Sequence, residues 1–402
     1  MSSSLSLSVP ATVPKAVAEG RLAPDYEGGS IVNLMASIMQ AFGAENPTYP
    51  PLRGLPATAL GRRNVVLLVI DGLGHDNLLA VYSDGVLARH LRERITSVFP
   101  ATTATAVTTF LCGTAPQQHG ITGWFTYFRE LGSPLTVLPY RLRGGGGAPA
   151  VPARKLFDHV PIFDVLRARC HAILPDRIVH SDFNTAHQGA ARPHGYASLG
   201  RMVDAIVQIV RTQGERNYVY AYWPELDRLA HERGIGSDEA TAHVAQIDAA
   251  FAALLDRIAG TDTTIIVTAD HGLIDSRPEQ RIELDRHPEL AGALRLPLCG
   301  ESRAAYCYVH AERRTEFLDY VRSRLAEHAD AIPSDYFVDV GYFGLGTPHP
   351  ELRERVGDYV LLMKRNASIK DWLPGEERYA HIGAHGGLSA QELYVPLIVA
   401  QR

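Results

Sequence analysis

Several features that mark whole classes of protein are scarce or missing in this chain of 402 residues. Its four cysteines are widely spaced and form no Cys-x-x-Cys pair, which argues against a disulfide framework and a cysteine metal site. No stretch of about 18 apolar residues is present, so an ordinary membrane span is not expected. The N-terminal region lacks the basic segment and apolar block of a secretory signal. From these absences we expect a cytoplasmic protein without membrane contact.

Long runs of positive charge are also missing. Lysine and arginine total 39, against 44 aspartate and glutamate residues, and the formal net charge is −5. A nucleic-acid polymer is therefore not the expected partner, because phosphate backbones are bound by concentrated basic side chains. With 46% hydrophobic and 21% charged residues, the composition is that of an ordinary globular protein. None of these quantities indicates an oligomeric state.

What the chain does contain is an alternation of apolar and amphipathic segments. Segments rich in β-branched or aromatic residues, typical of buried strands, are residues 65–70, 218–222, 264–268 and 394–399. Residues 199–211 and 239–259 repeat apolar side chains every three or four positions, which predicts helices. Strands that alternate with helices predict an α/β fold, with a mostly parallel central sheet covered by helices on both faces.

Two segments differ from this alternation. Residues 129–155 contain four consecutive glycines but no following Lys-Ser or Lys-Thr, so a mobile surface loop is expected rather than a phosphate-binding P-loop. Residues 287–375 have the texture of a small α+β unit, for which a cap over the site and a plain packing subdomain are both open. The predicted organisation is an N-terminal extension over 1–60, a catalytic core over 61–286 and 376–402, and an inserted α+β cap over 287–375.

Acidic and histidine side chains follow two of the predicted strands. Asp71 directly follows the strand at 65–70, and Asp270 and His271 follow the strand at 264–268. Asp-Gly after a strand is ordinary turn chemistry. However, ligands of open α/β sheets collect at the carboxyl ends of parallel strands. We therefore expect these side chains in one crevice.

Further candidate ligands occur near the other strands. Asp227 and His231 are four residues apart, so on a helical turn they share one face and can bind one ion, although a solvated Asp–His pair explains the spacing equally well. His381 and His385 lie in a glycine-rich turn before the last strand. Aspartate and histidine without thiolate suit zinc, with manganese or iron as alternatives. Their number favours two ions, which in pairs clamp a phosphoryl group during displacement.

A threonine-rich segment over 96–113 offers a nucleophile. Pro100 is a helix-starting residue, and a hydroxyl in the first helical turn faces free backbone N–H groups that can hold an oxyanion. A metal-bound threonine at this position would be an activated nucleophile. The alternative is that Thr102 caps the helix and the other threonines only pack.

The order of these residues resembles the alkaline phosphatase superfamily and, within it, most closely the type I phosphodiesterase/nucleotide pyrophosphatase family. The matching features are Asp71 after its strand, Phe-Pro-x-x-Thr ending at Thr103, Asp-x-x-x-His at 227–231, Asp-His-Gly at 270–272, His-Gly-Gly at 385–387, and the turn at 112–124. The resemblance implies a role for each residue. The ligands of one ion would be Asp227, His231 and His385, and those of the other Asp71, Asp270 and His271. Thr103 would be the nucleophile between them, while His119, in the turn, and His381 are not expected to be ligands.

The resemblance implies a metal-dependent hydrolase of phosphodiester or pyrophosphate bonds, acting on a small-molecule phosphate ester, with a nucleotide as one candidate. A phosphonoacetate-type C–P hydrolase and a phosphomonoesterase of the same superfamily remain alternatives. A non-catalytic metal-binding scaffold is a different class, against which the complete set of ligands argues. The family's asparagine after the nucleophile has no clear counterpart, Asn77 and Asn184 being candidates. The aromatic residues within 124–128 offer a stacking surface for a base, although packing is their commoner use.

Overall fold

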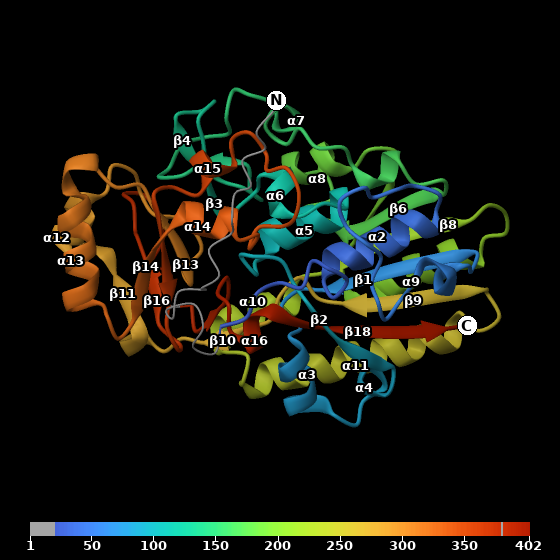
Figure 1. Cartoon of the computed structure of the whole chain (residues 1–402). Coiled ribbons are helices and arrows are strands. Elements are labelled where there is room, and N and C mark those ends of the chain that lie inside the picture. Colours follow the sequence, from blue (N-terminus) through green and yellow to red (C-terminus); the bar gives the residue numbers. More distant parts are fainter. Residues whose placement is uncertain (1–20, 379–380) are drawn as a thin grey trace, which may run out of the picture.

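A computed structural model describes residues 21–378 and 381–402 and contains two seven-stranded sheets (Figure 1). The strands of the first sheet, in spatial order, are β2 (Leu91–Thr96), β18 (Tyr394–Gln401), β9 (Thr263–Thr268), β1 (Asn64–Ile70), β8 (Asn217–Trp223), β6 (Arg169–Pro175) and β7 (Arg192–Tyr196). The five strands from β9 to β7 pair in parallel, and β18 is antiparallel to both of its neighbours. The prediction of a mostly parallel sheet is confirmed.

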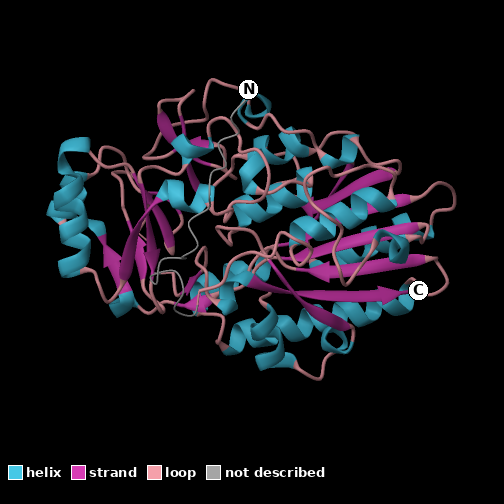
Figure 2. Ribbon diagram, in the orientation of Figure 1, coloured by secondary structure: helices cyan, strands magenta, loops and turns pink. Residues whose placement is uncertain are grey.

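Helices cover both faces of this sheet (Figures 1 and 2). On one face lie α2 (Ile31–Ala41) and α5 (Thr103–Cys112), and on the other α9 (Leu199–Arg211) and α11 (Asp238–Arg257). The other helices outside the second sheet are α3 (His75–Tyr82), α4 (Val86–Arg89), α6 (Pro116–His119), α7 (Ala153–Leu156), α8 (Asp182–His187), α10 (Glu225–Arg233) and α16 (Ala390–Leu393), with 3₁₀ turns at Ala57–Leu60 and Ile162–Asp164. None of the helices in the described part of the chain has both the length and the apolar character that a bilayer crossing requires.

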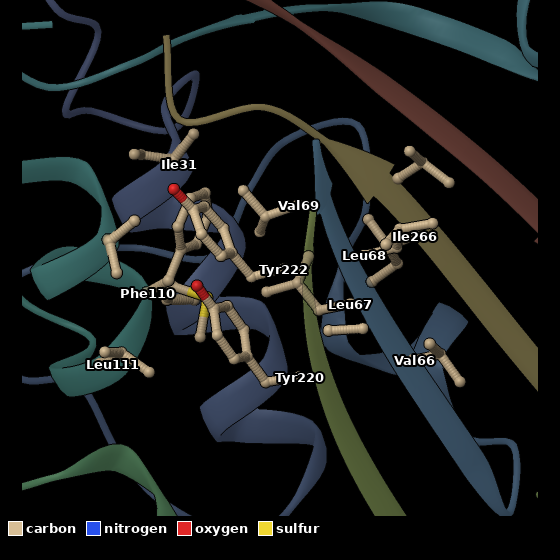
Figure 3. Close-up of a cluster of buried hydrophobic side chains, with 14 of the residues drawn as sticks. Ile31, Val66, Leu67, Leu68, Val69, Phe110, Leu111, Tyr220, Tyr222 and Ile266 are labelled. Atoms are coloured by element: carbon tan, nitrogen blue, oxygen red, sulfur yellow. The ribbon is translucent and has the colours of Figure 1, made fainter. Parts of the chain in front are cut away.

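The central strand β1 shows why the apolar strand segments of the sequence do not alternate between polar and apolar residues. Val69 lies on the side of Ile31 and Phe110 in Figure 3. Leu68, on the opposite side, borders the same small void as Met202 of α9. All seven residues of β1 are buried, because a strand covered by helices on both faces has no solvent side.

The carboxyl ends of the central strands lie level with one another. Ile70 of β1 is in register with Trp223 of β8, and β9 ends beside them at Thr268. The next residue after β1, Asp71, donates its backbone N–H to the carbonyl of Trp223 at 2.9 Å. Asp71, Asp270 and the start of α10 therefore meet at one edge of the sheet, as the strand pattern predicts.

The second sheet is antiparallel and draws on two separate parts of the chain. In spatial order its strands are β14 (Ala329–Pro333), β15 (Tyr359–Met363), β13 (Ala304–Cys307), β12 (Cys299–Gly300), β3 (Phe125–Phe128), β4 (Ser133–Thr136) and β5 (Arg141–Leu142). The helices of this part of the chain are α12 (Pro288–Ala293), α13 (Arg314–Arg324), α14 (Ser334–Asp339) and α15 (Leu352–Arg355), with 3₁₀ turns at Pro278–Gln280, Leu284–Arg286 and Ala311–Arg313. Two small two-stranded sheets pair β10 (Ile274–Asp275) with β17 (Gly383–Ala384) and β11 (Arg281–Glu283) with β16 (Ser368–Lys370).

The makeup of this sheet differs from the sequence-based expectation. Residues 287–375 supply β12 to β15, but β3 to β5 come from 125–142. Part of the segment 129–155, expected to be a mobile surface loop, therefore forms β4 and β5. These strands have four and two residues, too few for an alternation pattern, and they form by pairing with neighbouring strands rather than through local propensity.

Residues 21–60 pack into the main core. Leu34 and Ile38 of α2 are fully buried, and the hydroxyl of Tyr26 donates to the carbonyl of Tyr342 at 2.9 Å. The predicted N-terminal extension over 1–60 thus contributes, in its described part, a wall of the core. Residues 1–20 of that extension lie outside the described residues.

Candidate metal centre

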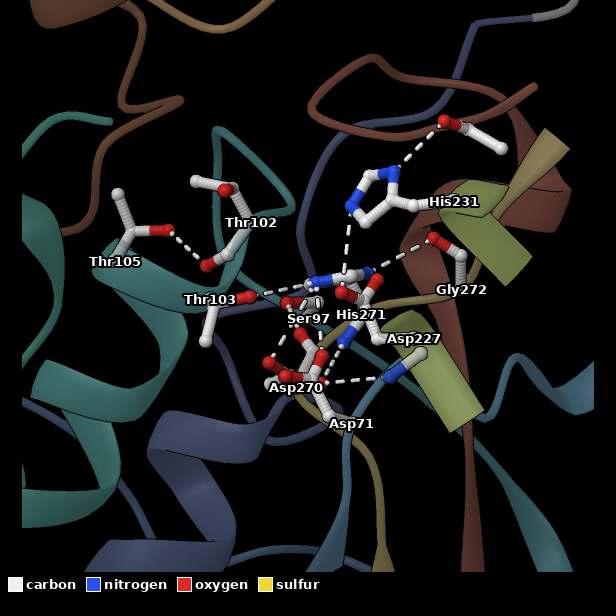
Figure 4. Close-up of polar contacts among 12 residues, drawn as sticks. Asp71, Ser97, Thr102, Thr103, Thr105, Asp227, His231, Asp270, His271 and Gly272 are labelled. Atoms are coloured by element: carbon white, nitrogen blue, oxygen red, sulfur yellow. Dashed lines mark hydrogen bonds and ion pairs between the residues drawn. The ribbon is translucent and has the colours of Figure 1, made fainter. Parts of the chain in front are cut away.

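Two aspartates and a histidine converge where β1 and β9 end (Figure 4). Asp71, Asp270 and His271 each place one ligand-type atom within 4.8 Å of the others. His271 Nε2 lies 3.3 Å from Asp71 Oδ1 and 3.6 Å from Asp270 Oδ2. These are the three residues that the family resemblance assigns to one ion.

A second group lies directly beside the first. Asp227, His271 and His385 also bring their ligand-type atoms within 4.8 Å of one another. The resemblance assigns His231 rather than His271 to this group. In the structure, His231 Nε2 lies 3.3 Å from Asp227 Oδ2, across one turn of α10, so it contacts the same carboxylate. His271 therefore stands between the two groups.

Backbone carbonyls orient two of these histidines. His231 Nδ1 lies 2.8 Å from the carbonyl of Gly383, and His271 Nδ1 lies 3.1 Å from the carbonyl of Gly272. A neutral ring that donates from Nδ1 carries a lone pair on Nε2, the atom that faces the carboxylates here. Burial lowers the pKa of His231 to about 4, which keeps its ring neutral and able to bind a metal.

Four ligand-type atoms of the centre have no hydrogen-bond partner within the described residues: Asp71 Oδ1, Asp227 Oδ1, Asp270 Oδ2 and His385 Nδ1. Burial and the charge of Asp270 raise the pKa of Asp71 well above its ordinary range, although the Tyr222 hydroxyl donates to the other Asp71 oxygen. Burial also raises the pKa of Asp227 to about 7. Unpaired buried carboxylates are costly unless positive charge compensates them. The donor set therefore fits divalent metal ions such as zinc, manganese or iron.

The two threonines at the start of α5 have different partners. Thr103 Oγ1 lies 3.1 Å from His271 Nε2, at the centre. The hydroxyl of Thr102 donates instead to Glu301 Oε1 at 2.6 Å and makes no capping bond to the helix. The alternative that the Thr102 side chain caps α5 is therefore wrong, because a buried carboxylate from the second sheet takes its hydroxyl.

A cavity of about 570 Å³ opens beside the centre. Thr103, Asp227, His231 and His385 line it from the core. From the second sheet and its neighbouring segments come Trp124, Phe125, Glu301, Lys370 and Trp372. Residues of the 287–375 unit thus form one wall of the cavity, as a cap would. The other aromatic candidates pack elsewhere: Tyr127 lies against Tyr308, and Phe128 is fully buried.

The remaining sequence candidates have structural partners. His119 is buried, and its Nδ1 accepts a backbone N–H two residues further on at 3.1 Å, as a structural turn requires. His381 lines the cavity and stacks on His231 with ring centroids 4.6 Å apart. Asn77 and Asn184 donate to backbone carbonyls and do not line the cavity. Neither asparagine therefore replaces the family's missing one.

A buried ion pair between Arg303 and Glu392 supports the turns that follow the candidate ligands His271 and His385, and the sequence contains no motif that predicts it. Glu392 Oε1 accepts the backbone N–H of Gly387 at 2.7 Å and Arg303 Nε at 3.1 Å. The backbone carbonyl of Glu392 accepts the N–H of Gly272 at 2.8 Å. Arg303 and Glu392 are 89 residues apart, so no local motif reports the pair.

Replacing Arg303 by methionine is expected to lower the free energy of unfolding by about 3–5 kcal/mol, because Glu392 would stay buried without its partner. Denaturant unfolding measures this loss. The matched control is Arg353→Met, whose partners Asp335 and Asp339 are exposed, and it should cost at most about 1 kcal/mol. Equal losses in the two variants would contradict the role of the pair.

Comparison with known proteins adds independent information. Residues 65–388 match the family model described as type I phosphodiesterase / nucleotide pyrophosphatase. The human ectonucleotide pyrophosphatase/phosphodiesterase family member 7 is 26% identical over 266 residues, which are 59% of this chain and 54% of that protein. The match therefore spans about half the length of this curated relative.

Solved structures with the same fold include two kinds of protein. Murine ectonucleotide pyrophosphatase / phosphodiesterase 5 superposes with a TM-score of 0.64 at 17% identity, over 83% of this chain and 87% of that one. An inactive threonine-to-alanine variant of that protein has been solved in complex with AMP. Phosphonoacetate hydrolase from Sinorhizobium meliloti 1021 gives 0.62 at 17% identity, over 84% and 90% of the two chains. At these identities the superpositions establish the alkaline-phosphatase-like fold.

Proposed function

This chain belongs to the type I phosphodiesterase / nucleotide pyrophosphatase family, and we propose that it hydrolyses phosphodiester or pyrophosphate bonds with Thr103 as nucleophile and two divalent ions. The observation that carries the proposal is the position of Thr103 Oγ1, 3.1 Å from His271 Nε2 within the cluster of candidate ligands. The threonine-to-alanine variant of the murine protein, described as inactive, supports a threonine in this role.

The proposed ligands of one ion are Asp71, Asp270 and His271, and those of the other are Asp227, His231 and His385. When bound, the ions supply positive charge that lowers the pKa of the nucleophile's hydroxyl and offsets charge on the phosphoryl oxygens. Backbone carbonyls hold the rings of His231 and His271, so the ligand geometry exists before a substrate arrives.

Catalysis by this chain would proceed in two displacements at phosphorus. Thr103 Oγ forms a bond to phosphorus as the bond to the leaving oxygen breaks, and the hydroxyl proton passes to solvent. Water then attacks the same phosphorus, the bond to Thr103 Oγ breaks, and the hydroxyl is restored. Thr103 is the first residue of α5, and backbone N–H groups in a first helical turn have no intrahelical partner, so those of α5 could donate to the phosphoryl oxygens.

Two neighbours point to different substrates. The complex of the murine protein with AMP favours a nucleotide, for which Trp124 and Trp372 offer aromatic surface in the cavity. Phosphonoacetate hydrolase, with nearly the same degree of structural similarity, favours a C–P bond as the alternative. The complete set of candidate ligands argues against a non-catalytic scaffold.

A substrate panel tests the proposal. The zinc-loaded protein would be assayed with an aryl phosphate monoester, an aryl phosphodiester, a dinucleoside pyrophosphate and phosphonoacetate. We expect the highest kcat/KM for the diester or the pyrophosphate. A preference for phosphonoacetate would replace the proposal with C–P hydrolysis, and no turnover of any substrate would contradict it.

A further inference from the structure

Among the described residues that line the cavity, one part-buried cation has no carboxylate at ion-pair distance. Lys370 ends β16 and lines the cavity together with Thr103. Within the described residues, no carboxylate lies at ion-pair distance from its Nζ, and its aromatic neighbour is the ring of Trp372 at 6.0 Å. An ammonium in such a position has lost part of its hydration without gaining a partner of opposite charge.

The other cations of the lining differ from Lys370. Arg143 is bound on several sides: its Nε lies 3.0 Å from Glu376 Oε1, its guanidinium covers the ring of Phe125 at 3.9 Å, and it donates to backbone carbonyls. Arg143 therefore braces the wall of the cavity. Arg141 is exposed to solvent. Lys370 alone among these cations is both part-buried and without an acidic partner in the described structure.

Lys370 also lies within electrostatic range of the metal centre. It lines the same cavity as the candidate ligands His231 and His385. Among the carboxylates, Glu301 has the largest effect on the pKa of Lys370. The Oε1 atom of Glu301, however, already accepts hydrogen bonds from the Thr102 hydroxyl at 2.6 Å and from the Trp124 backbone N–H at 2.7 Å. Burial lowers the pKa of Lys370 to about 8, so the ammonium form still prevails at neutral pH.

We propose that Lys370 binds a second anionic group of the substrate within the cavity. This inference rests on the proposed function and narrows its substrate class. The preferred substrates carry a phosphate or a carboxylate in addition to the phosphoryl group under attack. A charge-assisted hydrogen bond from Lys370 Nζ to that group replaces the hydration that the ammonium lost on burial. Trp124 and Trp372 line the same cavity and would contact an apolar part of the ligand.

Binding of three small ligands tests this without turnover when the metal-loaded protein and its variants also carry Thr103→Ala. Pyrophosphate and phosphonoacetate each carry a second anionic group, and methyl phosphate carries none. Lys370→Met should weaken pyrophosphate or phosphonoacetate by about 10- to 100-fold in calorimetry, and methyl phosphate by less than about threefold. The ligand that is more affected identifies the second group as phosphate or carboxylate. Lys370→Arg keeps the charge and should retain most of the affinity.

The matched control is Lys364→Met, the same substitution at a surface lysine that pairs with Asp330 at 2.7 Å, and it should leave all three affinities unchanged. Equal weakening of all ligands in Lys370→Met, or no weakening of any, would overturn the inference. The proposed function is scored separately by turnover of an aryl phosphodiester. If the protein turns over the phosphodiester but Lys370→Met leaves the ligand affinities unchanged, only the role of Lys370 is refuted. If Lys370→Met weakens binding as expected but the protein turns over no phosphodiester, only the proposed hydrolase function is refuted.

Discussion

Replacing Thr103 by alanine is expected to lower kcat by about three to four orders of magnitude, the loss typical of removing a covalent nucleophile that acts as part of a unit. Metal content should stay nearly unchanged, because six other candidate ligands remain. The measurement is kcat for the variant and the wild type at matched metal occupancy, with an aryl phosphodiester as substrate.

Thr102→Ala is the matched control for this prediction. Its hydroxyl donates to Glu301 rather than to the helix or the centre, so its removal should cost about 1 kcal/mol in stability. The same variant should keep kcat within about tenfold of the wild type, since the hydroxyl does not touch the reacting atoms. Wild-type turnover in Thr103→Ala together with an inactive Thr102→Ala would place the nucleophile one residue earlier.

Chelation of divalent ions is the second change with a large expected effect. It should abolish turnover, because the charge that activates Thr103 and offsets the phosphoryl oxygens would be gone. Resupplied zinc, manganese or iron should restore activity, and the most effective ion identifies the preferred metal. Elemental analysis of the metal-replete protein should give two ions per chain, and a value of one or less would contradict the two-ion mechanism.

Ligand variants distinguish the two ions. Asp71→Ala should empty one site and His385→Ala should weaken the other, because each belongs to one group of ligand-type atoms. His271 belongs to both groups, so His271→Ala should lower the occupancy of both sites. Loss of only one ion in His271→Ala would show that this ring serves a single site. Elemental analysis of the three variants, prepared identically, makes the comparison.

Much of the core and of the centre was predictable because its chemistry is local in sequence. The strands β1, β8 and β9 are continuous apolar segments, and the polar residues that follow them mark the carboxyl edge of the sheet. Asp227 and His231 are four residues apart on one helix, so their contact follows from helical geometry. The cytoplasmic location, in contrast, stays a prediction from sequence.

The rest depends on contacts between distant segments. The hydrogen bond from Thr102 to Glu301 joins residues that are 199 positions apart in the sequence. The residues around Thr102 indicate instead that its side chain caps the following helix, because they carry no information about Glu301. The support of two glycine turns by Glu392 arises only when the second sheet packs against the core. Lys370 is likewise an ordinary strand residue until β16 reaches the cavity.

The stereochemical course at phosphorus tests the central claim, a covalent Thr103 intermediate, most directly. The substrate would be a phosphodiester made chiral at phosphorus by sulfur, hydrolysed in isotopically labelled water by the metal-loaded wild type. Two successive displacements, first by Thr103 and then by water, predict overall retention of configuration. Inversion would mean that water attacks the substrate directly, and it would contradict the account.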